Sequence, residues 1–126
     1  MNPQGIITTQ SKYPVNETIN RLASFLQQHG ATIYARIDQQ AELANVGINI
    51  LPLQFILFGN PKAGGLLMKE NPLTALDLPL KIIAWEDDQR VVRVAYNEAS
   101  YLQDRYGLSS DLTAPLNLSV VIEKAL

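Results

Sequence analysis

The sequence contains no cysteine. A disulfide, a thiol nucleophile, a cysteine-ligated zinc ion and an iron–sulfur cluster are therefore all excluded. Histidine occurs once, at His29, so a metal site built from several histidines is also excluded. His29 is expected at the end of a helix, where the dipole favours a cation, and a structural or surface role explains it more simply than catalysis. No metal site is predicted, and no cofactor can be named.

Charged residues are scarce as well. They make up 17% of the chain, against about 25% in an average soluble protein. The net charge is -2 and no basic run is present, so binding to nucleic acid is not expected. Because little polar material is available to cover the outside, we predict an apolar surface patch that pairs with a second copy, giving a homodimer.

Long hydrophobic runs are missing too. The most apolar stretches, 48–58 and 78–85, are interrupted by proline or polar residues and are shorter than the roughly 18 residues that span a bilayer. No contact with a membrane is therefore predicted. The first residues, Met1 to Gly5, have neither the charged start nor the apolar stretch of a signal peptide. We expect a cytoplasmic protein.

The length of 126 residues suits one domain covering 1–126. Period-two patterns predict strands at 5–11, 32–38, 53–58, 80–85 and 90–96, with an extended stretch at 48–51. Helical patterns and caps predict helices at 15–29, 39–46, 61–70, 98–106 and 113–124, and a short one after Asn71-Pro72. Strand, helix, four further strands and a terminal helix favour an α+β sandwich, with an antiparallel sheet and helices packed mostly on one face.

The expected core combines one helix face with one face of each strand. In the strand at 32–38, we place Ile33, Ala35 and Ile37 together on the buried face. The predicted core residues are Ile19, Leu22, Leu26, Ile33, Ile37, Ile56, Val92 and Val94.

Three carboxylates follow apolar strands and are candidates for chemistry. Asp38, Glu86 and Asp87 each stand where a side chain emerges at a sheet end. If two of them lie close together, they could form an acid–base pair or bind a hard cation. The simpler alternative is a helix cap at Asp38 and a turn at 86–87, neutralised by Arg36 or Lys81.

The segment from Gly59 to Gly65 runs from a strand into a helix. Asn60 and Lys62 stand at the start of that helix, where free N–H groups could attract an anion. The spacing is not that of a phosphate loop, and Pro61 removes one donor. A structural turn is the alternative. Two adjacent glycines weaken the helix, so we also consider the segment 60–70 as a mobile lid.

Aromatic residues in the predicted strands and helices could line a pocket for a small molecule, with a few convergent polar groups. Packing inside the fold is the alternative. The residues considered are Tyr34, Trp85, Tyr96 and Tyr101, with Asn97 and Arg36 as the polar groups.

A set of short motifs stands in order along about residues 8–108. They are Ala35-Arg36-Ile37-Asp38, Phe58-Gly59-Asn60-Pro61-Lys62-Ala63-Gly64, Leu67-Met68, Asp77-Leu78-Pro79-Leu80-Lys81, Trp85-Glu86-Asp87, Tyr96-Asn97 and Tyr101-Leu102. With these motifs the chain resembles the family called domain of unknown function 302. The resemblance implies a fold of the TATA-binding-protein-like kind, a curved antiparallel sheet backed by helices, without implying DNA binding or an assigned activity. Relatives often have a histidine where this chain has Gln39, so no role of that histidine is carried over.

Three classes of function follow from these observations. We predict a non-enzymatic module that binds a small apolar or anionic ligand or another protein. The first alternative is an enzyme that uses carboxylates, Lys62 or Lys81, and tyrosines, with a metal or water in its site. The second is a structural subunit.

Overall fold

The computed structural model describes residues 3–126 and contains a five-stranded antiparallel sheet. Its strands are β1 (Ile6–Ser11), β2 (Thr32–Asp38), β3 (Leu53–Gly59), β4 (Leu80–Glu86) and β5 (Val92–Asn97). Their order is β1-β5-β4-β3-β2, so β4 is central and β1 and β2 form the edges. The predicted α+β class with an antiparallel sheet is confirmed. The architecture is compatible with the TATA-binding-protein-like fold that the resemblance implies.

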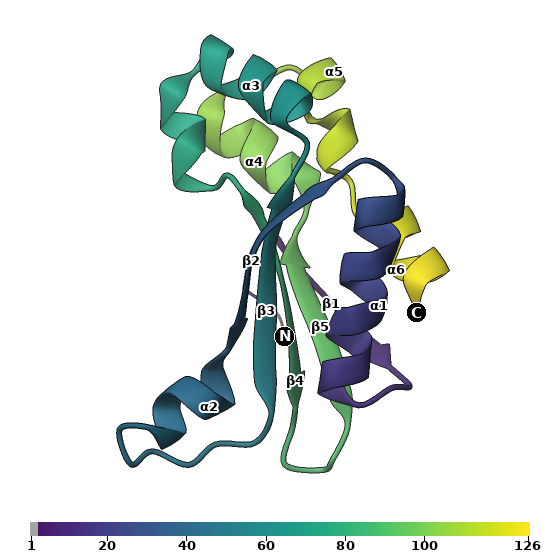
Figure 1. Cartoon of the computed structure of the whole chain (residues 1–126). Coiled ribbons are helices and arrows are strands. Elements are labelled where there is room, and N and C mark those ends of the chain that lie inside the picture. Colours follow the sequence, from purple (N-terminus) through teal and green to yellow (C-terminus); the bar gives the residue numbers. More distant parts are fainter. Residues whose placement is uncertain (1–2) are drawn as a thin grey trace.

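The helices occupy three places around the sheet (Figure 1). The long helix α1 (Val15–Gln28) and the C-terminal α6 (Ser119–Ala125) cover one face. The short α2 (Gln39–Ala44) projects on the opposite side and buries none of its residues. The remaining helices gather beyond the end of β3 and form a cap. They are α3 (Pro61–Glu70), the 3-10 helix η1 (Pro72–Leu76), α4 (Ala99–Tyr106), α5 (Ser110–Thr113) and the 3-10 helix η2 (Ala114–Leu116).

The end of the chain differs from the single helix expected over 113–124. It consists of α5, η2 and α6 instead. Pro115 has no N–H to donate to a helical carbonyl. Asn117 then restarts the helix, since its side chain accepts a hydrogen bond from the Ser119 N–H at 3.0 Å. Because of this break, η2 packs in the cap through Leu116, whereas α6 packs against α1.

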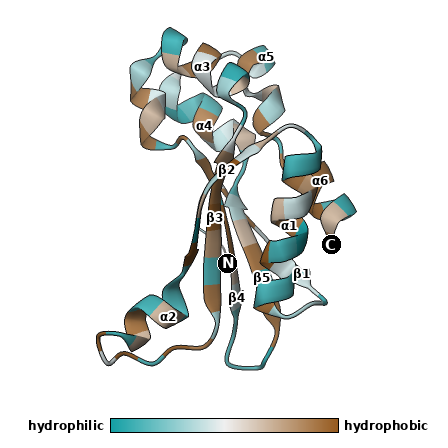
Figure 2. Ribbon diagram, in the orientation of Figure 1, coloured by the Kyte–Doolittle hydropathy of each residue, from teal (hydrophilic) through white to brown (hydrophobic). Residues whose placement is uncertain are grey.

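The main core lies between the sheet and the two covering helices. Ile19 and Leu22 of α1 are fully buried, as are Ile56 of β3 and Val94 of β5. Figure 2 shows the strands largely in brown, the hydrophobic colour, and α1 with alternating teal and brown residues, as expected for a helix that buries one side. A second, smaller core holds the cap together through Leu67, Leu102, Leu108 and Leu116.

One core prediction was wrong in β2. Ile33 pairs with Phe58 and packs on the main core, but a β-bulge follows, and Ala35 pairs with Leu57. An extra residue at a bulge moves the following side chains to the other face. Ile37 therefore lies on the uncovered face of the sheet beside Phe55, and Arg36 points to the α1 side instead.

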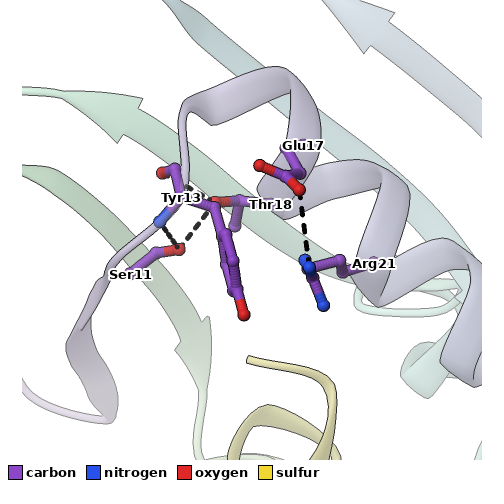
Figure 3. A network of polar contacts seen from close by, with 5 residues as sticks. All are labelled: Ser11, Tyr13, Glu17, Thr18 and Arg21. Carbon is purple, nitrogen blue, oxygen red and sulfur yellow. Dashed lines mark hydrogen bonds and ion pairs between the residues drawn. The ribbon is translucent and has the colours of Figure 1, made fainter.

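A polar latch joins the end of β1 to α1 (Figure 3). The Ser11 hydroxyl accepts from the Tyr13 N–H at 3.2 Å and donates to the Thr18 hydroxyl at 2.7 Å. Thr18 donates in turn to the Tyr13 carbonyl at 3.1 Å. Because Ser11 and Thr18 are buried, these bonds satisfy hydroxyls that would otherwise destabilise the fold. The Arg21 guanidinium covers the Tyr13 ring at 3.8 Å from its centre.

Candidate functional site

An apolar cavity of about 410 Å³ lies where α1, the sheet and the cap meet. Its walls come from the end of α1, the end of β3, the first half of α3, the segment 78–80 before β4, and the C-terminal segment 115–121. The volume falls within the range of about 300–1,000 Å³ that small-molecule sites usually have. The break in the C-terminal helix, described above, is what brings Pro115 and Leu116 to this cavity.

Small residues keep the cavity open on the α3 side. Ala63 and Gly64 line it from the first turns of the helix, opposite Phe58 of the sheet. A Cβ atom on Gly64 would lie 3.9 Å from the terminal methyl of Met68, another lining residue. The neighbouring Gly65 does not line the cavity. A larger side chain at position 64 would therefore occupy the space directly.

Polar groups stand only at the rim of the cavity. His29, Tyr34 and Asn60 line it and are all largely exposed. The His29 ring stacks on Phe25, and its Nδ1 donates to the Phe25 carbonyl at 2.8 Å. With the proton fixed on Nδ1, the neutral ring presents Nε2 as an acceptor. Within residues 3–126 the Tyr34 hydroxyl forms no hydrogen bond, so it can serve a ligand as donor or acceptor.

Asn60 stands where the sequence analysis placed it, at the cap of α3. Its side-chain oxygen accepts from the N–H groups of Lys62 and Ala63 at 3.0 and 3.3 Å. The N–H groups that were considered for an anion are thus already bonded to the cap. The exposed Lys62 is not among the residues that line the cavity. The lid expected for 60–70 stays a prediction, since the segment is a continuous helix here.

Arg36 belongs to a separate cluster on the α1 face near the β2 edge. Its guanidinium donates to the side-chain oxygens of Gln54 at 2.9 Å and Asn16 at 2.9 Å, and also to Asn20. Gln54 donates to Asn16 at 3.2 Å. These partners are neutral amides, so the cluster joins β2 and β3 to α1 by hydrogen bonds and not by an ion pair.

The three candidate carboxylates have separate partners. Asp38 caps α2 by accepting from the Ala41 N–H at 3.0 Å. Glu86 pairs with Arg90 at 3.2 Å across the β4–β5 turn. Asp87 accepts from Arg93 at 2.9 Å, and this bond, with backbone N–H groups, holds the pKa of Asp87 below its usual value. Within residues 3–126 no three His, Asp or Glu side chains are grouped as metal ligands would be.

The remaining candidates are spread over the molecule. Tyr96 lies in the main core, where burial, and then the charge of Glu98, raise the pKa of its hydroxyl. Trp85 borders a groove beside the segment 49–53. Lys81 and Asn97 line another groove below η1, and Tyr101 packs against Gly5. Of the residues considered for a site in the sequence analysis, Asn60 and Tyr34 line the apolar cavity.

Two of the residues at the rim were noticed in the sequence but not joined into one site. His29 is predicted at a helix end and Tyr34 in a strand, and both predictions are confirmed. Tyr34 is also considered as a pocket residue, but in a different group from His29 and Asn60. The walls were missed altogether. Phe25, Gly64, Pro79 and Leu116 come from four distant segments, and no local pattern in the sequence signals that these segments converge.

Comparison with known proteins finds relatives by sequence and by structure. It is 36% identical over 110 residues to proteins named fluoride-specific ion channel FluC 1 from Brucella suis and Brucella abortus. The match covers 86% of this chain but only 43% and 41% of those two proteins, so the chain spans less than half the length of these relatives. Among residues 3–126 there is no helix with the length and apolar character of a membrane span.

A crystal structure from Bacillus stearothermophilus has the same fold. It is described as an uncharacterized conserved protein DUF302, and it matches with a TM-score of 0.82 over 98% of this chain and 97% of that one, at 19% identity. The family model described as "Domain of unknown function DUF302" matches residues 7–124. The chain therefore belongs to the DUF302 family, as the motifs in its sequence indicated.

Proposed function

We propose that this protein is a non-enzymatic module that binds a small, mainly apolar ligand in the cavity between α1, β3 and α3. The observation that carries the proposal is the cavity itself, which combines an apolar wall with three polar groups confined to its rim. A site of this composition gains affinity from apolar contact and orientation from a few polar groups. The carboxylates considered for an enzymatic role lie outside this cavity and are bonded to the partners given above.

The rim defines the polar end of the ligand. Nε2 of His29 accepts a hydrogen bond, while the hydroxyl of Tyr34 can donate or accept. The amide nitrogen of Asn60 is a further donor, since the cap uses only the oxygen. A ligand with an apolar body and one hydroxyl group satisfies all three, because a hydroxyl both donates and accepts, whereas a carboxylate satisfies only the two donors. The absence of cysteine suits a reducing compartment, so the proposal places this module in the cytoplasm.

The experiment compares two leucine substitutions on neighbouring residues of α3. Gly64→Leu fills the cavity, whereas Gly65→Leu adds the same side chain beside it, where a Cβ meets nothing within 4 Å. Each variant and the wild-type protein are titrated with decanol and with decanoate, and heat release is measured by calorimetry. We expect binding to the wild type and to Gly65→Leu, and a loss of at least tenfold in affinity in Gly64→Leu. Equal affinities in all three proteins, or no binding to any, would contradict the proposal.

The relatives named as fluoride channels favour a second candidate. The region that matches this chain is less than half of each relative, and residues 3–126 contain no membrane-spanning helix. From this match we infer, as the second candidate, that the chain acts together with a membrane transport protein and that its cavity binds a regulatory ligand or fluoride itself.

Fluoride binding is tested on the isolated chain. The rim offers neutral groups and no cluster of cations, so the first proposal predicts the same thermal midpoint in sodium fluoride and sodium chloride of equal ionic strength. A rise of several degrees that is specific to fluoride, and that Lys62→Ala leaves unchanged but Tyr34→Phe removes, would favour the second candidate.

A further inference from the structure

We propose that the uncovered face of the sheet is a self-complementary interface on which a second copy of this chain docks. Helices α1 and α6 cover only the opposite face (Figure 1). The strand register places apolar side chains on the uncovered face along the three strands β2, β3 and β4. They are Ala35, Ile37, Leu53, Phe55, Leu57, Ile83 and Trp85. Phe55 is only 8% exposed, beneath the Lys81 ammonium, and the other six are partly exposed. A continuous apolar face of this kind favours a partner that covers it.

Two apolar projections stand at the ends of this face. One is the arm formed by α2 and the following loop, where Val46 and Ile48 are 69% and 52% exposed. Its return segment, 49–53, shares a groove with Ile83 and Trp85 of the uncovered face. The other is η1, where Leu73 and Leu76 are 61% and 73% exposed. Leu76 shares a groove with Leu57 and Lys81 of the same face.

The charges on this face favour a second copy over an unrelated partner. Ile83 is the middle residue of β4, which is the central strand of the sheet. The exposed Lys81 lies on one side of it, and Trp85 with the exposed Asp88 lies on the other. Consider a two-fold axis that passes by Ile83, lies in the interface plane and runs perpendicular to β4. It would bring Lys81 of each copy to Trp85 and Asp88 of its partner. A cation then meets an aromatic face and a carboxylate, twice.

The same axis brings the two projections together. The arm lies near the end of β4 and η1 near its start, so the arm of one copy faces the 3-10 helix of the other. Their exposed side chains, two from each element, are all aliphatic. In the dimer, these exposed side chains would therefore pack against one another.

The available area shows why the arm has to take part. The three apolar strands give a sheet floor of about 20 by 15 Å, or roughly 300 Å². A stable dimer buries roughly 600–1,000 Å² on each partner. The floor alone is too small, and the arm and η1 supply the remainder. Removing their apolar side chains should therefore be enough to separate the copies.

The test measures the mass of the full chain by sedimentation velocity at tens of micromolar. The wild type is expected to be a dimer. Val46→Asp places a charge on the arm, and Val120→Asp places the same charge on the outer side of α6, where Val120 is 52% exposed. Both sites are exposed, so folding is preserved and can be checked by circular dichroism. We expect Val46→Asp to be monomeric and Val120→Asp to remain dimeric.

A charge exchange tests the geometry of the axis. Lys81→Glu and Asp88→Lys should each weaken the dimer at least tenfold, and the double variant should recover most of this loss. A monomeric wild type would overturn the proposal and leave the face for a different partner. A dimer that survives Val46→Asp, or a charge exchange without recovery, would overturn it as well, because the copies would then meet elsewhere or in another orientation.

Discussion

The two adjacent glycines of α3 provide a sharp test of the local energetics. Gly64 and Gly65 lie inside the helix Pro61–Glu70, and neither has a positive φ. A Cβ at Gly65 meets nothing within 4 Å, and a Cβ at Gly64 only touches Met68 at 3.9 Å. Alanine at either position therefore adds no clash and removes the conformational freedom that glycine has in the unfolded chain. We expect each change to raise the free energy of unfolding by about 0.5–1 kcal/mol.

The assay combines thermal denaturation with hydrogen exchange. A gain of 1 kcal/mol should raise the thermal midpoint of a chain of this size by about 4 °C. If the cap opens before the sheet, the gain will instead appear as slower exchange of the α3 amides. Gly107→Ala is the matched control, because a Cβ there also meets nothing, but its φ of +63° penalises alanine. It should lower stability by about 1 kcal/mol. Lower stability in both Gly64→Ala and Gly65→Ala would refute the reasoning and show that α3 is strained.

Three further outcomes are expected. Leu22→Ala should cost about 2–5 kcal/mol in urea denaturation, because the side chain is fully buried under the sheet. Gly5→Ala should be strongly destabilising by the same measurement, since its Cβ would lie 2.6 Å from the Tyr101 ring at a φ of +81°. Burial and a hydrogen bond to Asp77 raise the pKa of Tyr106 above its usual 10.0. The folded chain thus holds this proton to a higher pH than the unfolded chain does. The contribution of Tyr106 to the free energy of unfolding should be fully present below pH 10.0 and be lost as the pH rises through the raised pKa. Tyrosinate absorbance and denaturation at each pH measure the two effects.

Local sequence signals were sufficient for most of the framework. The period of apolar residues from Val15 located α1, and Asn60-Pro61 located the start of α3. Gly107 was expected to end α4, and it does so in the left-handed conformation. Each of these features depends on residues within one or two turns of the chain, which is why the pattern alone identifies them.

Features that depend on distant segments were not predictable in the same way. The bulge after Ile33 is set by the pairing of β2 with β3, and it reverses the face on which Ile37 lies. Alternation within β2 contains no sign of it. The cavity likewise takes part of its wall from Pro115 and Leu116, which lie at the break in the C-terminal segment. Asp38 and Asp87, which the sequence offered as candidates for catalysis or metal binding, serve in the structure as a helix cap and a turn residue.

The position of β1 at the edge of the sheet has a consequence for synthesis. The strands from β2 to β5 pair in chain order, each with the next, but β1 pairs with β5, which begins about 80 residues after β1 ends. At about 5–20 residues per second, a ribosome releases β1 some 4–16 s before its partner exists. During that interval, the Ser11–Thr18 bond can already hold β1 against α1. The first strand to be made is therefore the last to enter the sheet.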